Sequence, residues 1–276
     1  MTFKVKVYGA RGSVPVSGPD TEIFGGNTPC VLAQVDDHVI VFDAGSGIIQ
    51  LGKDLREQGF KEIDLFLSHP HYDHIIGLPF FEKFKDKEAH VRIWSAGSEA
   101  IPDTRTMLDE YMRAPFFPVT LSAFPAKIEE RTIQNGDKIG LHTGIIVKTI
   151  ELNHPGKATG YRVEYGGHSF CYISDFEHDD GIMDLNLTRF IEGADLAVLD
   201  ATYTSDEYQF TKGFGHSTWQ ACGKICEKAG VKEWRLFHHE HSKTDETLLA
   251  IERDVQNEYP NASLAREGET IELGHH

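Results

Sequence analysis

The stretch Ser68-His69-Pro70-His71-Tyr72-Asp73-His74 constrains this chain more than any other, because it places three imidazoles and a carboxylate within six positions. It follows an apolar run at 63–67 that predicts a short buried strand, so the histidines fall where a strand ends and a loop begins. A solvated histidine-rich turn is disfavoured, because imidazoles at this density would repel one another on protonation unless a metal held them neutral. One segment can therefore offer a ligand pair to each of two cations, and imidazole and carboxylate suit zinc, iron or manganese.

The charge of the chain argues against a long polyanionic partner. Lys and Arg number 27 against 43 Asp and Glu, and the formal net charge is −16. A protein that grips many phosphates usually shows basic clusters. The densest cluster here, at 83–87, is flanked by Glu82 and Glu88. We therefore expect no long nucleic acid as the partner.

Length and composition predict one soluble domain. The 276 residues include 40% hydrophobic residues, enough for a substantial core, and no linker or repeat interrupts them. We expect a single domain over 1–273, with a purification-tag remnant as the reading of 274–276. The N-terminus enters a strand pattern directly and no run is long enough to span a membrane, so a cytoplasmic location is expected.

The cysteines show no spacing typical of a disulfide framework or a zinc knuckle. They are Cys30, Cys171, Cys222 and Cys226, and the last two are four residues apart in a helical pattern. We expect packed thiols.

Other predicted strands also end on potential ligands. A hairpin of 30–34 and 38–42 leads into Asp43, the strand 147–152 leads to His154, and the hairpin 159–164 with 169–173 leads to Asp175. The strand 232–237 precedes His238 and His239. Asp43 alone could cap the predicted helix 48–58.

The pattern His-x-His-x-Asp-His resembles the signature of the metallo-β-lactamase superfamily, and the resemblance extends through most of the chain. It implies an α/β fold, a four-layer αββα sandwich of two mixed sheets with two divalent metal ions at one sheet edge. The ligands that it implies are His69, His71, Asp73, His74, His154, Asp175 and His239. Asp175 would bridge the two cations, which repel each other unless an anion lies between them.

Two of these assignments leave alternatives. His239 is placed by aligning the hydrophobic run before it, and His238 is the fallback, because adjacent strand residues point opposite ways and only one should reach the metals. The superfamily gives Asp43 a role in hydrogen-bonding the metal-site loop, which is compatible with a helix cap.

The segment Gly215-His216-Ser217-Thr218 resembles the phosphodiesterase branch that includes ribonuclease Z. There the histidine lies beside the metals and assists at the scissile phosphate, so His216 and Asp73 are candidate catalytic residues and Ser217 a candidate substrate contact. In the alternative interpretation, Ser217 or Thr218 only caps the predicted helix 219–229, with His216 on the surface.

The stretch 98–118 predicts a helix that begins near Pro102 and ends at residues 114–119. The aromatic pair Phe116 and Phe117 at its end could belong to the core. It could equally form a wall over the metal site, so both are candidate substrate contacts.

The predicted reaction is hydrolysis of a small phosphodiester by a dinuclear metal enzyme. A hairpin fills 155–174, where ribonuclease Z carries its long tRNA-gripping arm. Arg11-Gly12-Ser13 and Gly25-Gly26-Asn27-Thr28 resemble compact phosphodiesterases of bacteria and phages, some of which open cyclic nucleotides. A 3′,5′-cyclic nucleotide is the leading candidate, zinc the expected metal with manganese or iron as alternatives, and a homodimer is suggested by the relatives.

Three other functions compete with this prediction. An RNA nuclease would need a basic surface, and a hydrolase of β-lactams, lactones or thioesters would have no need of His216. A non-catalytic metal or nucleotide sensor would bind without turnover. The fold alone cannot separate them, because one scaffold hosts many reactions.

Overall fold

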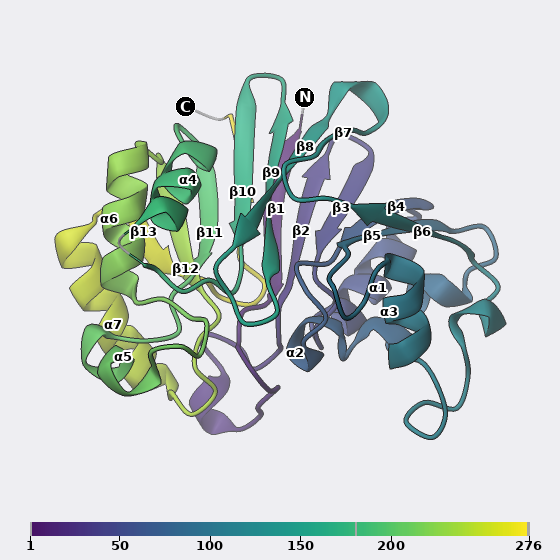
Figure 1. Cartoon of the computed structure of the whole chain (residues 1–276), viewed down its shortest axis with the longest axis horizontal. Helices are drawn as coiled ribbons and strands as arrows, with labels where there is room; N and C mark the ends of the chain where they lie inside the picture. Colours follow the sequence, from purple (N-terminus) through teal and green to yellow (C-terminus); the bar gives the residue numbers. More distant parts are fainter. Residues whose placement is uncertain (1, 180, 275–276) are drawn as a thin grey trace.

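The protein is described here from a computed structural model that covers residues 2–179 and 181–274. Within these ranges the strands form two seven-stranded sheets. Figure 1 shows the sheets at the centre of the molecule and the helices on the outside. The predicted αββα sandwich of two mixed sheets is confirmed. The suggested tag remnant falls largely on residues 275 and 276, which lie outside the described residues.

The first sheet has the strand order β14-β1-β2-β3-β4-β5-β6. The strands from β3 to β6 run parallel, and the β14-β1-β2-β3 pairs are antiparallel. Their bounds are β1 Phe3–Gly9, β2 Cys30–Val35, β3 His38–Phe42, β4 Glu62–Phe66, β5 His90–Ala96, β6 Lys127–Ile133 and β14 Thr270–Glu272.

The second sheet has the order β13-β12-β11-β10-β9-β8-β7. It is parallel from β10 to β13 and antiparallel from β7 to β10. Its strands are β7 Lys138–Gly140, β8 Ile146–Leu152, β9 Ala158–Tyr165, β10 His168–Ile173, β11 Leu196–Asp200, β12 Glu233–Phe237 and β13 Ala262–Leu264. In both sheets the parallel strands end at the same edge, so side chains that follow different strands can meet there.

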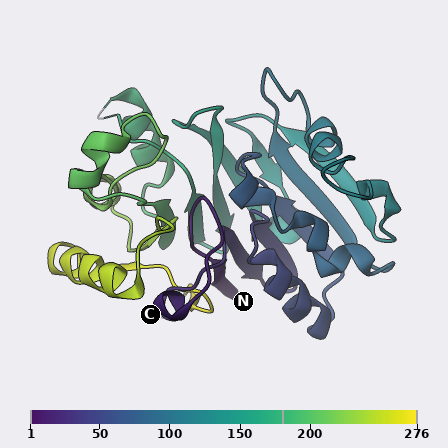
Figure 2. The same cartoon turned by 90° about the horizontal axis from the view of Figure 1, so that it is seen from below.

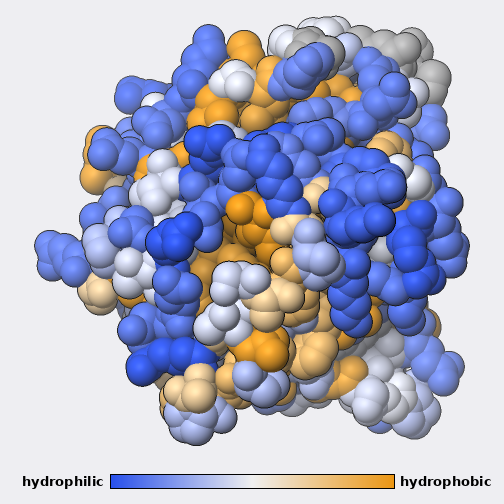
Figure 3. Space-filling view, turned by 90° about the vertical axis from the view of Figure 1, so that its right-hand side faces the viewer, coloured by the Kyte–Doolittle hydropathy of each residue, from blue (hydrophilic) through white to orange (hydrophobic). Residues whose placement is uncertain are grey.

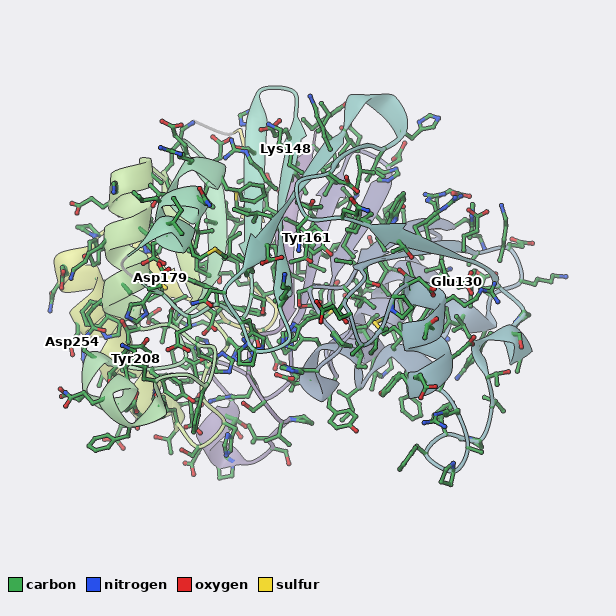
Figure 4. All side chains as sticks on the ribbon, viewed as in Figure 1. Glu130, Lys148, Tyr161, Asp179, Tyr208 and Asp254 are labelled. Carbon is green, nitrogen blue, oxygen red and sulfur yellow. The ribbon has the colours of Figure 1, made fainter. Side chains whose placement is uncertain are left out.

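Aromatic rings fill the space between the sheets. Phe42 lies 5.2 Å from Tyr172, and Phe66 lies 5.2 Å from Tyr161, measured between ring centroids. Tyr161 is labelled near the centre of Figure 4, and its hydroxyl donates a hydrogen bond to Leu67 O at 2.6 Å. Burial of such rings is the main favourable term that joins the sheets, and the Tyr161 bond fixes the backbone at the start of the metal-site loop.

Helices cover the outer faces of both sheets, as Figure 2 shows from below. They are α1 Ile48–Glu57, α2 Tyr72–Ile75, α3 Thr104–Tyr111, α4 Ile182–Phe190, α5 Ser205–Thr211, α6 Trp219–Ala229 and α7 Asp245–Glu258. Short 3₁₀ turns are η1 Pro19–Thr21, η2 Leu78–Phe80, η3 Glu82–Lys85, η4 Leu121–Ala123 and η5 His142–Gly144.

The spacing of apolar residues along the helices and the residues that cap them explain why these helices form and pack on the sheets. In α1, Ile48, Leu51 and Leu55 repeat at helical spacing and are buried in the cluster under the first sheet. In α6, the Thr218 hydroxyl accepts the Ala221 N–H, and Gly230 ends the helix in a left-handed conformation. The prediction of a helix over 219–229 is confirmed.

The predicted helix begins near Pro102 as expected, with Asp103 as its N-cap, but it ends before residues 114–119. The helix α3 ends at Tyr111, because Met112 leaves helical geometry with φ −101° and ψ 54°. Pro115 follows, and a proline disfavours helical conformation in the residue before it. Residues 112–120 therefore form a loop, and this loop presents Phe116 and Phe117.

The surface on the side of β6 and α3 is mainly hydrophilic. Figure 3 shows this face with polar residues over much of it and apolar residues in separate patches near the top, at the centre and below. No helix among the described residues is long and apolar enough to cross a membrane. Cys30, Cys171, Cys222 and Cys226 are buried free thiols, as predicted.

Candidate metal centre

The segment His69–His74 follows β4 at the lower edge of the sandwich in Figure 1, where α2 is labelled. Pro70 disfavours helical geometry in His69, and His71 is extended with φ −65° and ψ 151°, so the helix begins only at Tyr72. This local turn directs His69, Asp73 and His74 into the protein, where all three are buried.

The first ligand group consists of three imidazoles and one carboxylate. It contains His69, His71, His154 and Asp175, whose ligand atoms all lie within 4.8 Å of one another. His71 Nδ1 is 2.8 Å from His69 Nε2 and 3.1 Å from His154 Nε2. Asp175 Oδ2 lies 3.5 Å from His69 Nε2 and 3.8 Å from His154 Nε2.

The second ligand group shares Asp175, and all four of its residues are buried. It contains Asp73, His74, Asp175 and His238. Asp175 Oδ1 lies 3.2 Å from His74 Nε2 and 3.3 Å from His238 Nε2, and Asp73 Oδ2 lies 3.1 Å from His238 Nε2. The two oxygens of Asp175 therefore face different groups, which is the geometry of a bridging carboxylate.

The chemistry of these groups fits divalent cations. One proton can join His71 Nδ1 to only one of its two nitrogen neighbours, so the remaining lone pairs need a cation. His74 Nε2 is buried and has no hydrogen-bond partner among the described residues. Burial opposes a charge on His74, but Asp175, Asp73 and Asp43 raise the pKa of the ring well above its usual value. The same carboxylates would attract a metal ion.

Hydrogen bonds from outside orient the imidazoles. Asp43 accepts His74 Nδ1–H at 2.7 Å, Gly215 O accepts His154 Nδ1–H at 2.8 Å, and Thr202 Oγ1 lies 3.0 Å from His238 Nδ1. When Nδ1–H of an imidazole donates to one of these outer partners, the tautomer of the ring is fixed. The unprotonated Nε2 then faces the ligand group.

Asp43 supports the loop and does not cap a helix. It is fully buried with φ 60°, and it also accepts hydrogen bonds from Ser68 N at 2.7 Å and Tyr172 OH at 2.7 Å. The helix α1 begins after Gly47 instead. The interpretation of Asp43 as a helix cap is therefore wrong, and the structure places it against the metal-site loop.

The assignment of His239 as the last ligand is wrong, and the fallback His238 takes the position. His239 Nε2 donates to Ala265 O at 2.8 Å, and its ring meets Phe24 edge-on at 5.6 Å. His238 adopts φ 61° directly after β12, and this left-handed turn directs its ring into the second group. A hydrophobic run alone does not show on which side of the strand the next residue points.

The N-terminal segment packs against the second group. Gly12 N donates to His239 O at 2.8 Å, and Ser13 N donates to Asp73 Oδ2 at 2.7 Å. A Cβ on Gly12 would lie 2.4 Å from the His238 ring. The segment Arg11-Gly12-Ser13 thus fixes the positions of Asp73 and His238. Residue 12 must be glycine, because the His238 ring leaves no room for a side chain.

His216 lies beside both groups and pairs with Asp200. His216 Nδ1 is 2.8 Å from Asp200 Oδ2 and 4.0 Å from Asp175 Oδ2, and its ring stacks on His238 at 4.8 Å. Burial opposes the charge of His216, but the Asp200 carboxylate raises its pKa to about 9. The surface alternative for His216 is wrong, while Thr218 does cap α6.

A cavity of about 890 Å³ opens over the two groups. Its polar side includes His71, Asp73, Asp175 and His216. The rest of its lining is mainly apolar and aromatic and includes Tyr72, Ile75, Ile101, Met107, Tyr111, Phe116 and Phe117.

The aromatic candidates differ from Ser217 in their position. Phe116 is 82% exposed at the wall, and Phe117 packs edge-on against Phe80 at 5.9 Å, so the core alternative is wrong for Phe116. Ser217 is fully buried, and its hydroxyl donates to Phe176 O at 2.7 Å. Ser217 therefore holds the backbone and does not line the cavity.

Comparison with known proteins identifies the family. Residues 38–239 match the model of the beta-lactamase superfamily domain. The chain belongs to the beta-lactamase superfamily. It is 23% identical to a ribonuclease Z of Haloarcula marismortui over 86% of each chain, and 24% identical to a ribonuclease Z of Picrophilus torridus over 96% of this chain and 94% of that one.

Solved structures share the fold. The metallo-beta-lactamase fold protein YhfI of Bacillus subtilis has a TM-score of 0.75 and 20% identity over 99% of this chain and all of YhfI. A diphosphatase of the PhnP family has a TM-score of 0.71 at 21% identity, covering 99% of this chain and 98% of that one. Short-form human tRNase Z has a TM-score of 0.70 at 19% identity, covering 99% and 100%. This member of the superfamily is a metal-dependent hydrolase, and divalent metal ions are its cofactors.

Several residues of this superfamily site were missed at the level of the sequence. Asp200 is the last residue of β11, and Asp175 likewise comes after β10. A carboxylate at the end of a buried strand was therefore a sequence signal that could have identified Asp200 as a site residue. Thr202 and Tyr172 carry no such signal. They are ordinary residues whose position depends on the assembled sheets.

Proposed function

We propose that this hydrolase is a dinuclear phosphodiesterase whose substrate is a small phosphodiester, with a 3′,5′-cyclic nucleotide as the leading candidate. The observation that carries the proposal is the His216–Asp200 pair beside two ligand groups bridged by Asp175. A thioester releases a thiolate, which leaves without a proton donor, whereas cleavage of a phosphodiester releases an alkoxide oxygen that needs one.

The proposed hydrolysis gives the metal ions, His216 and Asp200 different roles. Two divalent cations, when bound, would lower the pKa of water and polarise the phosphoryl group. In the hydrolysis, the oxygen of water joins phosphorus, the bond from phosphorus to one ribose oxygen breaks, and that oxygen takes a proton. His216 can give this proton, because Asp200 accepts Nδ1–H and leaves Nε2–H as the second donor of the charged ring. The proton that leaves water can recharge His216 through solvent.

The cavity supports a small substrate. Its volume of about 890 Å³ falls within the usual range for small-molecule sites. The aromatic wall with Phe116 and Phe117 offers a surface on which a nucleobase can stack, worth about 1–3 kcal/mol per base in other proteins. The hairpin β9–β10 fills the sequence between His154 and Asp175, and the net charge of −16 disfavours a long polyanion.

Zinc is the proposed metal. Both groups offer imidazole nitrogens and carboxylate oxygens without a thiolate. This donor set suits zinc and also manganese or iron(II). Reconstitution of the metal-free protein with each ion, followed by titration of the bound equivalents, distinguishes them.

Product formation from a panel of cyclic nucleotides tests the function. The metal-loaded protein should release nucleoside monophosphate, detected by chromatography, and Asp73→Ala and His216→Ala should each lower kcat by at least about 100-fold. His241→Ala is the matched control, because His241 is half-exposed and pairs only with Glu240 among the described side chains. Hydrolysis of a lactone or thioester that survives His216→Ala, without any cyclic-nucleotide opening, would overturn the proposal.

A ribonuclease Z-like activity is the second candidate, favoured by the names of the sequence relatives. A precursor tRNA in the same assay separates the two. Cleavage of the RNA with no opening of cyclic nucleotides would establish the nuclease and reject the small substrate.

A further inference from the structure

The loop 212–218 carries His216 but has little regular structure of its own. It lies between α5 and α6, and Gly213 and Gly215 adopt φ values of 91° and 88°. A Cβ on Gly215 would lie 2.3 Å from His154 Nδ1, so the loop passes directly over a metal ligand. Such a loop can place a catalytic side chain only if other contacts hold its backbone.

The carboxylate of Glu177 provides these contacts. Glu177 is buried, and its Oε1 accepts hydrogen bonds from Gly213 N at 2.8 Å and Tyr208 OH at 2.7 Å. Its Oε2 accepts from Gly215 N at 3.0 Å. Tyr208 belongs to α5 and is labelled at the lower left of Figure 4. Charged acceptors form stronger hydrogen bonds than neutral ones, so this carboxylate is a firm anchor.

The backbone of Glu177 is tied to the other side of the site. Glu177 N donates to Asn153 O at 2.7 Å, and Asn153 Nδ2 donates to Glu177 O at 2.7 Å. Asn153 precedes the ligand His154, and Glu177 follows the bridging Asp175 by two residues. Three segments that are distant in sequence therefore meet at this one residue.

We propose that Glu177 is a positioning residue, which holds the loop 213–216 so that Gly215 O orients His154 and His216 faces the leaving oxygen. The part concerning His216 rests on the proposed phosphodiesterase function. The part concerning His154 does not, because His154 Nδ1–H donates to Gly215 O whatever the substrate.

The variant Glu177→Gln tests the proposal with nearly unchanged shape. Its single carbonyl oxygen would face three donors, and its amide group would point N–H toward N–H. The loop should therefore shift while the rest of the site remains.

The leaving group provides a readout that general destabilisation would not move. A ribose oxygen is a poor leaving group and needs a proton donor, whereas the nitrophenolate of bis(4-nitrophenyl) phosphate does not. For the cyclic nucleotide that the wild type opens, Glu177→Gln should lower kcat at least about tenfold with little change in KM. For bis(4-nitrophenyl) phosphate the loss should stay within about threefold.

The double variant Glu177→Gln with His216→Ala supplies a second readout. If Glu177 acts through His216, the double variant should open the cyclic nucleotide no more than about threefold more slowly than His216→Ala alone.

The affinity of the protein for zinc tests whether Glu177 positions His154, and this measurement needs no enzymatic activity. Removal of an outer hydrogen-bond partner of a metal ligand costs about 10- to 100-fold in affinity. Competition with a chromogenic chelator should therefore show one of the two bound zinc ions weakened by at least about tenfold in Glu177→Gln.

Two controls match the design. Glu192→Gln makes the same chemical change on the surface, and Tyr208→Phe removes one donor while leaving both amide bonds to Glu177. Both should remain within about threefold of wild type in kcat and zinc affinity. If Glu177→Gln fails to fold, Glu177→Asp, which withdraws the carboxylate from the loop, should give the same pattern.

Equal kcat losses on both substrates together with unchanged zinc affinity would overturn the proposal, as would wild-type behaviour in every assay. If the wild type opens no phosphodiester, the proposed function fails. The zinc titration then still decides whether Glu177 positions His154.

Discussion

At the scale of single residues, the site depends on contacts that leave no room for additional atoms. Gly12 is the clearest case, because its backbone lies against the ring of His238 while Ser13 N holds Asp73. Both residues belong to the second ligand group. The N-terminal segment therefore determines the position of two ligands that come from the two different sheets.

Gly12→Ala should displace His238. The new Cβ would lie 2.4 Å from the ring, and overpacking of this kind typically costs about 1–3 kcal/mol of stability. We expect zinc affinity to fall by at least about tenfold, measured by chelator competition. Gly140→Ala is the matched control, since no atom lies within 4 Å of a Cβ at Gly140. Unchanged zinc affinity in Gly12→Ala would show that the contact does not position His238.

At the scale of elements, Asp64 links three neighbouring strands of the first sheet. It is fully buried in β4, accepts Arg92 Nε–H at 2.7 Å and Trp94 Nε1–H at 2.8 Å from β5, and lies 2.8 Å from His38 Nε2 of β3. Burial opposes the charge of Asp64, but the hydrogen bonds from Arg92 and His38 lower its pKa to about 2.

Asp64 should make the stability of the fold depend on pH in acid. Because the folded pKa lies below the ordinary value of 3.8, this group stabilises the folded state above about pH 4, and its contribution is lost as pH falls toward 2. The shift corresponds to about 2 kcal/mol.

Asp64→Asn should therefore be less stable than wild type at pH 7, by about 3–5 kcal/mol because a buried partner of Arg92 is lost. The difference should narrow below pH 4. Urea unfolding of both metal-free proteins between pH 7 and pH 3 measures it, with the exposed Asp37→Asn as control. A difference that does not change with pH would contradict this role.

At the scale of the whole molecule, the architecture and most of the ligands followed from the resemblance of local sequence motifs to the superfamily. The segment His69–His74 is dense enough to be recognised alone, and the superfamily pattern supplied His154 and Asp175. The choice between His238 and His239 was wrong, because it depends on a left-handed turn after β12. The roles of Gly12 and Asp200 depend on contacts between segments far apart in sequence.

Metal removal should weaken the molecule as a whole, because each ligand group joins the two sheets. His69, His71, Asp73 and His74 follow β4 of the first sheet, whereas the remaining ligands follow β8, β10 and β12 of the second, namely His154, Asp175 and His238. A metal bound only by the folded state at about 1,000 times its Kd stabilises that state by about 4 kcal/mol. For a chain of this size, this corresponds to a fall of roughly 10 °C in Tm after chelation.

Differential scanning calorimetry before and after chelation, and after zinc is restored, measures this effect. His238→Ala should retain only part of the zinc-dependent shift, because the group that includes His69 and His154 stays intact, whereas His241→Ala should retain all of it. A Tm that chelation does not change would mean that the sheets hold the ligands in place without help from a metal. The site would then be prearranged by Asp43, Tyr161 and the N-terminal segment alone.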